Sequence, residues 1–296
     1  MNEPARPLPR LDLRELEALA RRALAEDLGE EGDITSKRII RTEQPARGRI
    51  VAKSPGVLAG GPVAEAVFHF VDKGLAILWF ASDGDLLEPR QEVAALSGRA
   101  RAMLAAERVA LNFLQHLSGV ATLTAQFVER CSPHGVQVLC TRKTLPGLRA
   151  VQRYAVAVGG GQLHRAGLFD AILIKANHTR LSGGLAEAVR RVKTAIRARE
   201  IDAEVEVASL EELQEALAAG VDRILLDNAG PEIIGEAVRA TRGRAFLEVS
   251  GGLTLDNVEA VARLGPDAVS VGAITHSVPA LDLALTILGP AGAGPR

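Results

Sequence analysis

The amino-acid sequence predicts an α/β protein in which a small α+β domain precedes a (β/α) barrel of six to seven parallel strands. At 296 residues the chain is long enough for about two domains. Beyond residue 135, short apolar runs alternate with helical patterns, and the last four runs begin about 20 residues apart. Continuous apolar strands separated by helices indicate parallel strands covered on both faces. Six or seven such units favour a barrel over an open sheet, and no GxGxxG motif opens a helix after a strand.

The N-terminal part combines helical patterns with strand-like pieces that Gly, Pro and Asp turns separate. In chain order these segments are residues 11–28 (helical), 46–61 and 75–96 (strand-like) and 99–131 (helical). On the longer helical pattern, Arg108, Asn112 and His116 stand at i, i+4 and i+8, so they lie along one side of the predicted helix. A solvated polar stripe is the simpler interpretation of that spacing.

Charge and composition exclude several functional classes. The chain has 35 basic and 36 acidic side chains, and its net charge of −1 disfavours nonspecific nucleic-acid binding. Aromatic residues make up 3% of the chain, too few for base-stacking platforms. No apolar run reaches ~18 residues, so no membrane span is expected. The only cysteines, Cys131 and Cys140, have no metal or disulfide spacing, and the first ten residues lack an apolar signal. We therefore expect a soluble cytoplasmic protein.

Polar side chains gather near the carboxyl ends of the predicted barrel strands, where barrel enzymes keep their active sites. The apolar runs are VQVLC, AILIK, EVEVA, RILLD, FLEVS and AVSVG, between residues 136 and 272. An ionisable or small hydrogen-bonding residue lies at or near the end of each run: Thr141, Arg142, Lys143, Lys175, Glu206, Asp227, Ser250 and Ser270. Because the ends of parallel strands meet at one rim, we predict that these side chains share one cavity.

Two short segments follow the last two runs and precede helical patterns: Ser250-Gly251-Gly252 and Ser270-Val271-Gly272. Glycine lets backbone N–H groups approach an anion closely, and a helix N-terminus adds favourable partial charge. Barrels that bind phosphorylated substrates commonly hold the phosphate after their seventh and eighth strands. The two segments therefore predict a phosphate site, a feature that barrels of many chemistries share.

Positive charge is concentrated around the Gly-Gly-Gly run that precedes the second barrel strand. Arg142, Lys143, Arg165 and Lys175 are expected to line the cavity, with His164 as a group that donates or accepts a proton. Arg presents a planar fork to carboxylate or phosphate, and Lys presents a compact charge. Such a lining suits a substrate with several anionic groups.

Carboxylates in the same cavity need a different task, because unpaired carboxylates repel phosphates. We expect Glu206 and Asp227 to hold sugar hydroxyls, a divalent metal or a developing cation. A further helix is predicted to begin near Pro146. For Arg149 and Arg153 on that helix we expect a solvated or interface face.

A series of motifs runs along nearly the whole chain. In order they are ALAEDLGEEGDITS, LSGRARAMLAAERVALNFLQHLSGVAT, TRKTLPGLRAVQRYAV, GGGQLHR, LIKANH, EVEV, LLDN, SGGLTLDN and SVGAITHS. Together they closely resemble the quinolinate phosphoribosyltransferase family, also called nicotinate-nucleotide pyrophosphorylase (carboxylating). So many separate matches in one order make the resemblance very specific.

The resemblance implies a two-domain protomer. An N-terminal α/β, sandwich-like domain, here residues 1–114, is joined by the C-terminal tail, here residues 275–296; residues 115–274 then form an open, incomplete (β/α) barrel. The implied activity is that of a pentosyltransferase, which joins quinolinate to phosphoribosyl pyrophosphate with Mg²⁺. Nicotinate mononucleotide, pyrophosphate and CO₂ leave, and the product feeds NAD biosynthesis. The resemblance also implies a homodimer in which the N-terminal region of one chain completes the partner's site.

The resemblance also implies roles for single residues. Those that look like the quinolinate pocket are Arg142, His164, Arg165 and Lys175, and Arg108 looks like the residue lent by the neighbouring subunit.

Other positions resemble the phosphoribosyl pyrophosphate site. Lys143, Glu206 and Asp227 look like its catalytic groups, and Mg²⁺ is expected near the two carboxylates through the substrate, with no direct protein ligand assigned. The remaining substrate-binding residues, among them the loops that hold the 5′-phosphate, are Thr141, Ser250, Gly251, Gly252, Ser270, Val271 and Gly272.

The chain departs from the family pattern in three motifs. Ala176 stands where Asp usually follows the barrel lysine, EVEVAS stands where EVEVEN is common, and QLHR stands where HNHR is often seen. Ala176 removes a carboxylate near Lys175, which is expected to alter how that lysine is oriented or ionised. The sequence leaves Lys143, His164 and a water molecule as candidate donors of the proton that replaces CO₂.

Three alternatives stay open at this point. The first is a related phosphoribosyltransferase that acts on another pyridine carboxylate. The second is a barrel isomerase or aldolase that uses Lys175 as a Schiff-base nucleophile. The third is a noncatalytic metabolite-binding or scaffold protein.

Overall fold

The structure is a computed structural model that describes residues 8–199 and 203–289, with the backbone alone at residues 194–199. It contains two compact units. The first comprises the described parts of residues 1–123, 150–159 and 278–296, and the second comprises residues 124–149 and the described parts of 160–277. The unit boundaries thus differ from the predicted domain limits, since residue 114 lies inside a helix and residues 150–159 group with the first unit.

Helix α5 (Arg149–Val158) supplies the segment that groups with the first unit. Within that unit the Tyr154 hydroxyl donates to Asp83 Oδ2 at 2.8 Å, and Gln152 Nε2 lies 2.9 Å from His116 Nε2. These contacts join residues far apart in the chain. The local sequence pattern does not indicate such partners. For this reason the sequence-based prediction assigns this helix to the barrel domain.

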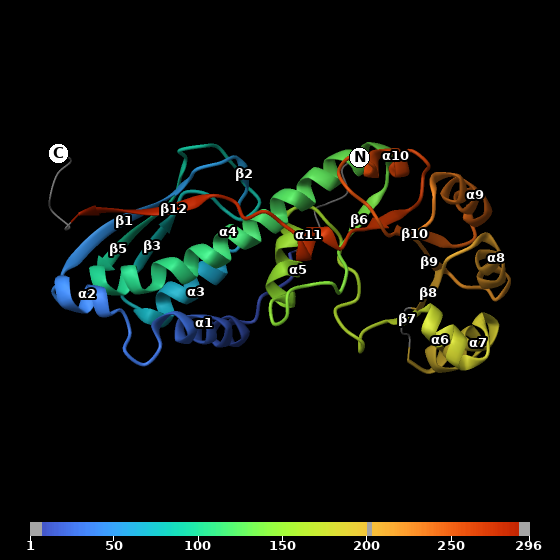
Figure 1. Cartoon of the computed structure of the whole chain (residues 1–296), viewed down its shortest axis with the longest axis horizontal. Coiled ribbons are helices and arrows are strands. Elements are labelled where there is room, and N and C mark those ends of the chain that lie inside the picture. Colours follow the sequence, from blue (N-terminus) through green and yellow to red (C-terminus); the bar gives the residue numbers. More distant parts are fainter. Residues whose placement is uncertain (1–7, 200–202, 290–296) are drawn as a thin grey trace. The chain divides into compact units, whose positions relative to one another are not determined.

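The first unit is built on a four-stranded antiparallel sheet (Figure 1). Its strands, in spatial order, are β12 (Leu283–Gly289), β1 (Pro45–Ala52), β5 (Glu92–Arg99) and β3 (Ala76–Trp79). A separate ribbon pairs β2 (Gly56–Val57) with β4 (Leu86–Leu87). Alternate residues of β1, such as Ile50 and Ala52, are buried, so one face of the sheet packs on the core.

Helices complete the core of the first unit together with β1 and β5. They are α1 (Leu13–Leu28), α3 (Gly61–Val71) and the first part of α4 (Ala100–Cys131). The carboxylate of Asp12 begins α1 by accepting the backbone N–H of Arg14 at 2.7 Å. Asp33 caps the short helix α2 (Ile34–Ile39) in the same way. The helices expected over residues 11–28 and 99–131 are therefore present.

The second unit contains the predicted barrel, and the described residues form six parallel strands. Their spatial order is β6 (Gln137–Leu139), β11 (Ala268–Ser270), β10 (Phe246–Ser250), β9 (Arg223–Asp227), β8 (Ala203–Val207) and β7 (Ile172–Ile174). Every predicted apolar run overlaps one of these strands. Because β6 and β7 stand at the two edges of the sheet and do not pair with each other, the barrel is open.

Helices follow five of the barrel strands, and α6 to α9 lie along one side of the sheet (Figure 1). The helices are α6 (Ala176–Ser182), α7 (Leu185–Arg199), α8 (Leu210–Ala218), α9 (Pro231–Thr241), α10 (Val258–Ala262) and α11 (Ala273–His276), and the 3₁₀ turn η1 (Ser132–His134) precedes β6. Within the described ranges, no helix of the chain is long and apolar enough to cross a bilayer.

The Gly-Gly-Gly run leads into an extended segment beside β6. Gln162 bridges to this strand, because its N–H donates to Val138 O at 2.7 Å and its carbonyl accepts from Cys140 N–H at 3.0 Å. His164 and Arg165 follow after Leu163. The segment therefore turns these two side chains toward the strand ends, as expected from an irregular loop after the glycines.

Candidate active site

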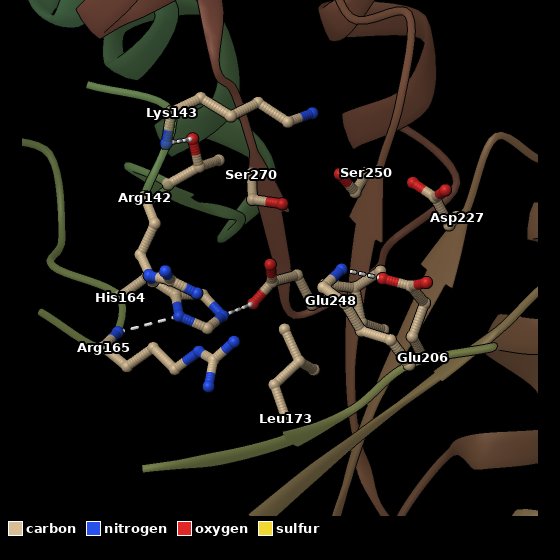
Figure 2. A pocket seen from close by; sticks show the side chains of 13 residues that line it. Arg142, Lys143, His164, Arg165, Leu173, Glu206, Asp227, Glu248, Ser250 and Ser270 are labelled. Carbon is tan, nitrogen blue, oxygen red and sulfur yellow. Dashed lines mark hydrogen bonds and ion pairs between the residues drawn. The ribbon is translucent and has the colours of Figure 1, made fainter. Parts of the chain in front are cut away.

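A cavity of about 360 Å³ opens at the carboxyl ends of the barrel strands, within the second unit (Figure 2). The predicted residues that line it are Thr141, Arg142, Lys143, His164, Arg165, Lys175, Glu206, Asp227, Ser250 and Ser270. Leu173, Leu225 and Glu248 also line it. The fold thus brings to one place side chains from β7, β8, β9, β10 and β11, together with side chains from the loop after β6 and the loop before β7.

The remaining predicted residues do not line this cavity: Arg108, Gly251, Gly252, Val271 and Gly272. Arg108 is exposed on α4 in the first unit. The other four residues follow the lining serines Ser250 and Ser270 within two positions.

The two Ser/Gly segments differ from each other in geometry. Gly251 has φ 99°, and a Cβ there would lie 2.1 Å from Asn228 Oδ1, so the turn requires glycine. Helix α10 begins only at Val258, so the expected helix N-terminus does not follow Gly252 directly. Gly272 is followed at once by α11, which has four residues. Only the second segment has the predicted order of glycine and then helix.

The two arginines and the carboxylates of Glu206 and Asp227 lie on opposite sides of the cavity (Figure 2), and Lys175 is on the carboxylate side as the partner of Glu206. Arg142, His164 and Arg165 lie on one side. Glu206 and Asp227 lie on the other, on the neighbouring strands β8 and β9. One cavity therefore offers both a surface for anionic groups and a surface for hydroxyls or positive charge.

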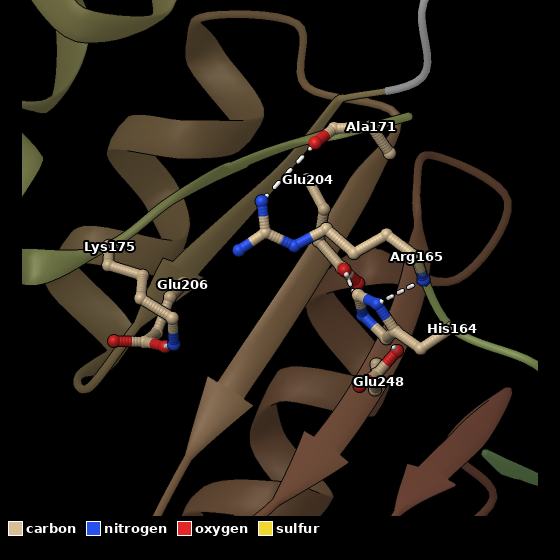
Figure 3. Close-up of polar contacts among 7 residues, drawn as sticks. All are labelled: His164, Arg165, Ala171, Lys175, Glu204, Glu206 and Glu248. Carbon is tan, nitrogen blue, oxygen red and sulfur yellow. Dashed lines mark hydrogen bonds and ion pairs between the residues drawn. The ribbon is translucent and has the colours of Figure 1, made fainter. Parts of the chain in front are cut away.

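The two arginines on the basic side influence each other. Burial, followed by the positive charge of Arg142, lowers the pKa of the Arg165 guanidinium. Arg142 Nε is buried and has no hydrogen-bond partner among the residues that the structure describes. Arg165 Nη1 donates to the Ala171 carbonyl at 3.2 Å (Figure 3). Like-charged, incompletely paired guanidinium groups favour binding of an anion between them.

Lys175 and Glu206 form an ion pair at the cavity rim (Figure 3). The Lys175 side chain is 44% exposed and that of Glu206 is 16% exposed, so the pair borders both solvent and the cavity. Lys175 is also the N-cap of α6, and its backbone N–H donates to His178 Nδ1 at 2.9 Å. Ala176 supplies no side-chain oxygen beside it, and Glu206 is the carboxylate that orients the lysine.

Two hydrogen bonds of its backbone groups hold Lys143 in place in the loop after β6. Lys143 N–H donates to Thr141 Oγ1 at 3.0 Å, and the buried Thr275 hydroxyl donates to Lys143 O at 2.8 Å. Thr275 belongs to α11, which follows the last barrel strand. The side chain of Lys143 therefore extends along the cavity from a fixed base (Figure 2).

His164 contacts two buried glutamates below the cavity rim (Figure 3). Its Nε2 lies 2.9 Å from Glu204 Oε2 and 3.7 Å from Glu248 Oε2. Its Nδ1 accepts the backbone N–H of Arg165 at 2.8 Å, so the neutral ring carries its proton on Nε2. The ligand atoms of these three side chains lie within 4.8 Å of one another. However, both ring nitrogens are engaged within the protein, and none is free to ligate a metal.

Burial controls the protons of this cluster. Burial, and then the charge of Glu204, raises the pKa of Glu248 to about 7. For His164, burial lowers the pKa, but the hydrogen bond to Glu204 and the charges of both glutamates outweigh it, so the pKa is raised. In the described part of the chain neither carboxyl oxygen of Glu248 has a hydrogen-bond partner. The cluster therefore retains protons that exposed glutamates lose.

The free energy of unfolding is expected to fall between pH 5 and pH 8, in part because of Glu248. Its folded pKa of about 7 exceeds that of an unfolded Glu. The stabilising proton is thus fully present below the unfolded pKa and is lost as the pH rises through about 7. The loss is at most about 3 kcal/mol. Denaturant titrations at both pH values should show a smaller fall in Glu248→Gln than in the wild type, and an equal fall would contradict this account.

Two residues of this cluster, Glu204 and Glu248, escaped sequence reasoning because they lie before the strand ends. The alternation of side chains along the strands could have indicated these two residues. Glu204 precedes Glu206 by two positions in AEVEV, and Glu248 precedes Ser250 by two in FLEVS. Residues two apart on a strand share a face, so a charged residue at that spacing points into the barrel below the rim.

The oxygens of Glu206 and Asp227 are those that suit Mg²⁺, which prefers hard oxygen ligands. Each carboxylate already has a partner: Lys175 pairs with Glu206, and Asn228 Nδ2 donates to Asp227 Oδ2 at 2.8 Å. The two carboxylates therefore offer the oxygen chemistry that suits Mg²⁺, but each already serves another partner.

The fold and the cavity define an open α/β-barrel enzyme whose mouth receives an anionic substrate. Comparison with family models identifies the family to which this enzyme belongs. Residues 33–118 match the N-terminal domain of quinolinate phosphoribosyl transferase, and residues 120–286 match its C-terminal domain. The chain belongs to the quinolinate phosphoribosyltransferase family, as its motifs indicate.

Individual relatives agree with this assignment. The chain is 40% identical to the chloroplastic nicotinate-nucleotide pyrophosphorylase [carboxylating] of Arabidopsis thaliana, over 92% of this chain and 83% of the relative. It is 38% identical to the probable nicotinate-nucleotide pyrophosphorylase [carboxylating] of Bacillus subtilis, over 92% and 93%. The structure of the Francisella tularensis nicotinate-nucleotide pyrophosphorylase superposes with a TM-score of 0.89 at 40% identity, over 94% of this chain and 98% of that one.

Proposed function

We propose that the chain transfers the phosphoribosyl group of phosphoribosyl pyrophosphate to the ring nitrogen of quinolinate, and that decarboxylation then yields nicotinate mononucleotide. Pyrophosphate and CO₂ are the other products. The observation that carries the proposal is the division of charge in the cavity, with Arg142 and Arg165 facing Glu206 and Asp227. The relatives carry the name of this carboxylating activity. The cytoplasm stays the predicted location of this step in NAD biosynthesis.

The basic side of the cavity suits the two carboxylates of quinolinate. Arg142 and Arg165 each present a planar fork, and an anion between them relieves their mutual repulsion. Lys175 adds a third positive charge from the opposite rim, where it pairs with Glu206. These contacts fix the ring so that its nitrogen lone pair points at the ribose.

Transfer needs stabilisation of charge on both sides of the breaking bond. As pyrophosphate leaves, the anomeric carbon becomes cationic, and Glu206 and Asp227 orient the ribose hydroxyls and stabilise that charge. Lys143 stabilises the negative charge of the leaving group. When bound with the substrate, Mg²⁺ supplies further positive charge for the pyrophosphate. The ring nitrogen attacks without a base, so catalysis depends mainly on alignment.

Decarboxylation follows because the ribosylated ring nitrogen is an electron sink. The carboxylate next to it leaves as CO₂, and the carbon takes up a proton. The neutral ring of His164 has its Nε2 proton toward Glu204 and its Nδ1 occupied by the Arg165 N–H. That arrangement disfavours His164 as the donor and leaves Lys143 or a water molecule.

The surroundings of Lys175 argue against an aldolase-type activity. A Schiff-base lysine is activated in an apolar pocket or beside another cation. Lys175 instead pairs with the carboxylate of Glu206 and is half exposed. A phosphoribosyltransferase that acts on another pyridine carboxylate is the alternative that the assay below must separate.

A homodimer with a shared site forms part of the proposal. Arg108 is exposed on α4 of the isolated chain and lies outside the cavity lining. An exposed arginine is suited to completing the quinolinate pocket of a second chain. The dimer thus supplies a further cation to the basic side of the cavity.

Quinolinate, phosphoribosyl pyrophosphate and Mg²⁺ together are expected to give equal amounts of pyrophosphate and CO₂. A coupled pyrophosphate assay and trapping of labelled CO₂ measure the two products. Nicotinate should release almost no pyrophosphate, because its single carboxylate leaves part of the basic side unpaired. EDTA should stop turnover, and excess Mg²⁺ should restore it. Equal turnover of nicotinate, or pyrophosphate release without CO₂, would contradict the proposal.

A further inference from the structure

The guanidinium of Arg149 joins the two loops that carry the basic residues of the cavity. Its Nε donates to Thr144 Oγ1 at 3.0 Å, and its Nη2 donates to the Arg142 carbonyl at 3.3 Å. Its Nη1 donates to the Ala166 carbonyl at 3.1 Å. The first two acceptors belong to the loop between β6 and α5, and the third belongs to the loop between α5 and β7. One planar group thus connects both loops.

Arg149 is well placed to connect the two loops. It is the first residue of α5, so its base is part of a helix, and it is half-buried. It does not line the cavity. The expectation of a solvated face is therefore wrong for Arg149, because its guanidinium donates to three protein acceptors.

Each loop has internal hydrogen bonds that hold it ready for this connection. In the first loop the Arg142 carbonyl also accepts Thr144 N–H at 2.9 Å. In the second loop the Asp170 carboxylate accepts the N–H groups of Ala166 at 2.6 Å and Gly167 at 2.9 Å. These hydrogen bonds order each loop internally, and Arg149 determines how the two loops lie relative to each other.

We propose that Arg149 is a positioning residue that sets the spacing between the basic side chains of the two loops. Arg142 and Lys143 lie in the first loop, and His164 and Arg165 lie in the second. The inference rests on the proposed function, because a rigid dicarboxylate needs its cations at a fixed separation. Misplacement by about 1 Å costs roughly 100-fold in rate, so the spacing has a large effect although Arg149 touches no substrate.

Arg149→Ala should lower kcat/KM for quinolinate by roughly 100-fold, mostly through a higher KM. Arg149→Lys should recover part of it, to about tenfold below the wild type, because an ammonium cannot reach all three acceptors. Thr144→Val, which removes one acceptor, should cost about threefold. Arg242→Ala is the control, since Arg242 is exposed at the end of α9. Arg242→Ala should keep wild-type kinetics.

Amide hydrogen exchange, measured by mass spectrometry, reports how readily the two loops open and does not depend on catalysis. Arg149→Ala should exchange faster than the wild type in residues 141–145 and in residues 164–168, with unchanged rates in α8 and α9. Unchanged exchange in either loop, or wild-type kcat/KM in Arg149→Ala, would overturn the inference. If the wild type does not turn over quinolinate, the proposed function fails, and exchange alone decides the role of Arg149. If Arg149→Ala does not fold, Arg149→Lys and Thr144→Val carry the same comparison.

Discussion

Replacing Arg142 with alanine is expected to lower kcat/KM for quinolinate roughly ten- to hundredfold without destabilising the folded protein. Loss of one charge-assisted hydrogen-bond partner of the substrate costs about 1.5–3 kcal/mol. The fold loses little, because Arg142 Nε is a buried donor with no partner among the described residues, and its charge repels Arg165. The hydrogen bond from Arg149 to residue 142 remains, since the acceptor is a backbone carbonyl.

Two matched variants separate charge from geometry at this position. Arg142→Lys keeps the charge but loses the planar fork, so its kcat/KM should lie between those of the wild type and Arg142→Ala. Arg165→Ala should lose as much activity as Arg142→Ala but should also be slightly less stable, because it gives up the bond to Ala171 O. Steady-state kinetics and thermal unfolding measure both properties. Full activity in Arg142→Ala would remove it from the pocket, and a large fall in its Tm would refute the electrostatic account.

The barrel could be predicted because its signal is local. Each strand is a continuous apolar run, each helix shows its own spacing, and their alternation determines a parallel sheet. The topology then converts position in the sequence into position in space. For this reason, residues such as Lys175 and Asp227 could be assigned to one cavity before any contact between them was known.

Contacts across the chain could not be predicted in this way. Tyr154 bonds to Asp83 and thereby associates α5 with the first unit, and Arg149 bonds to two loops at once. Neither residue has a neighbour in the sequence that reveals its partner. Glu204 and Glu248 are intermediate cases, because strand alternation places them inside the barrel, but their shared contact with His164 depends on the loop that follows the glycine run.

Mixed dimers of Arg108→Ala and Lys175→Ala chains are expected to recover activity that neither parent has. Each parent homodimer carries its substitution in both sites, so each should lose at least about tenfold in kcat/KM. If a site combines Arg108 from one chain with Lys175 from the other, a heterodimer has one site with both substitutions and one site with neither. A purified heterodimer should then show about half of the wild-type activity.

The same experiment gives a different result if Arg108 serves the cavity of its own chain. Each site of the heterodimer then carries one substitution, and activity stays at the level of the parents. Chains with different affinity tags, unfolded and refolded together or coexpressed, yield the heterodimer after two purification steps. Random pairing of equal amounts should give about a quarter of the wild-type activity before separation. A control mixture of Lys175→Ala with Arg165→Ala distinguishes the cases further: Lys175 and Arg165 line one cavity within one chain, so their heterodimer has no intact site and should show no recovery.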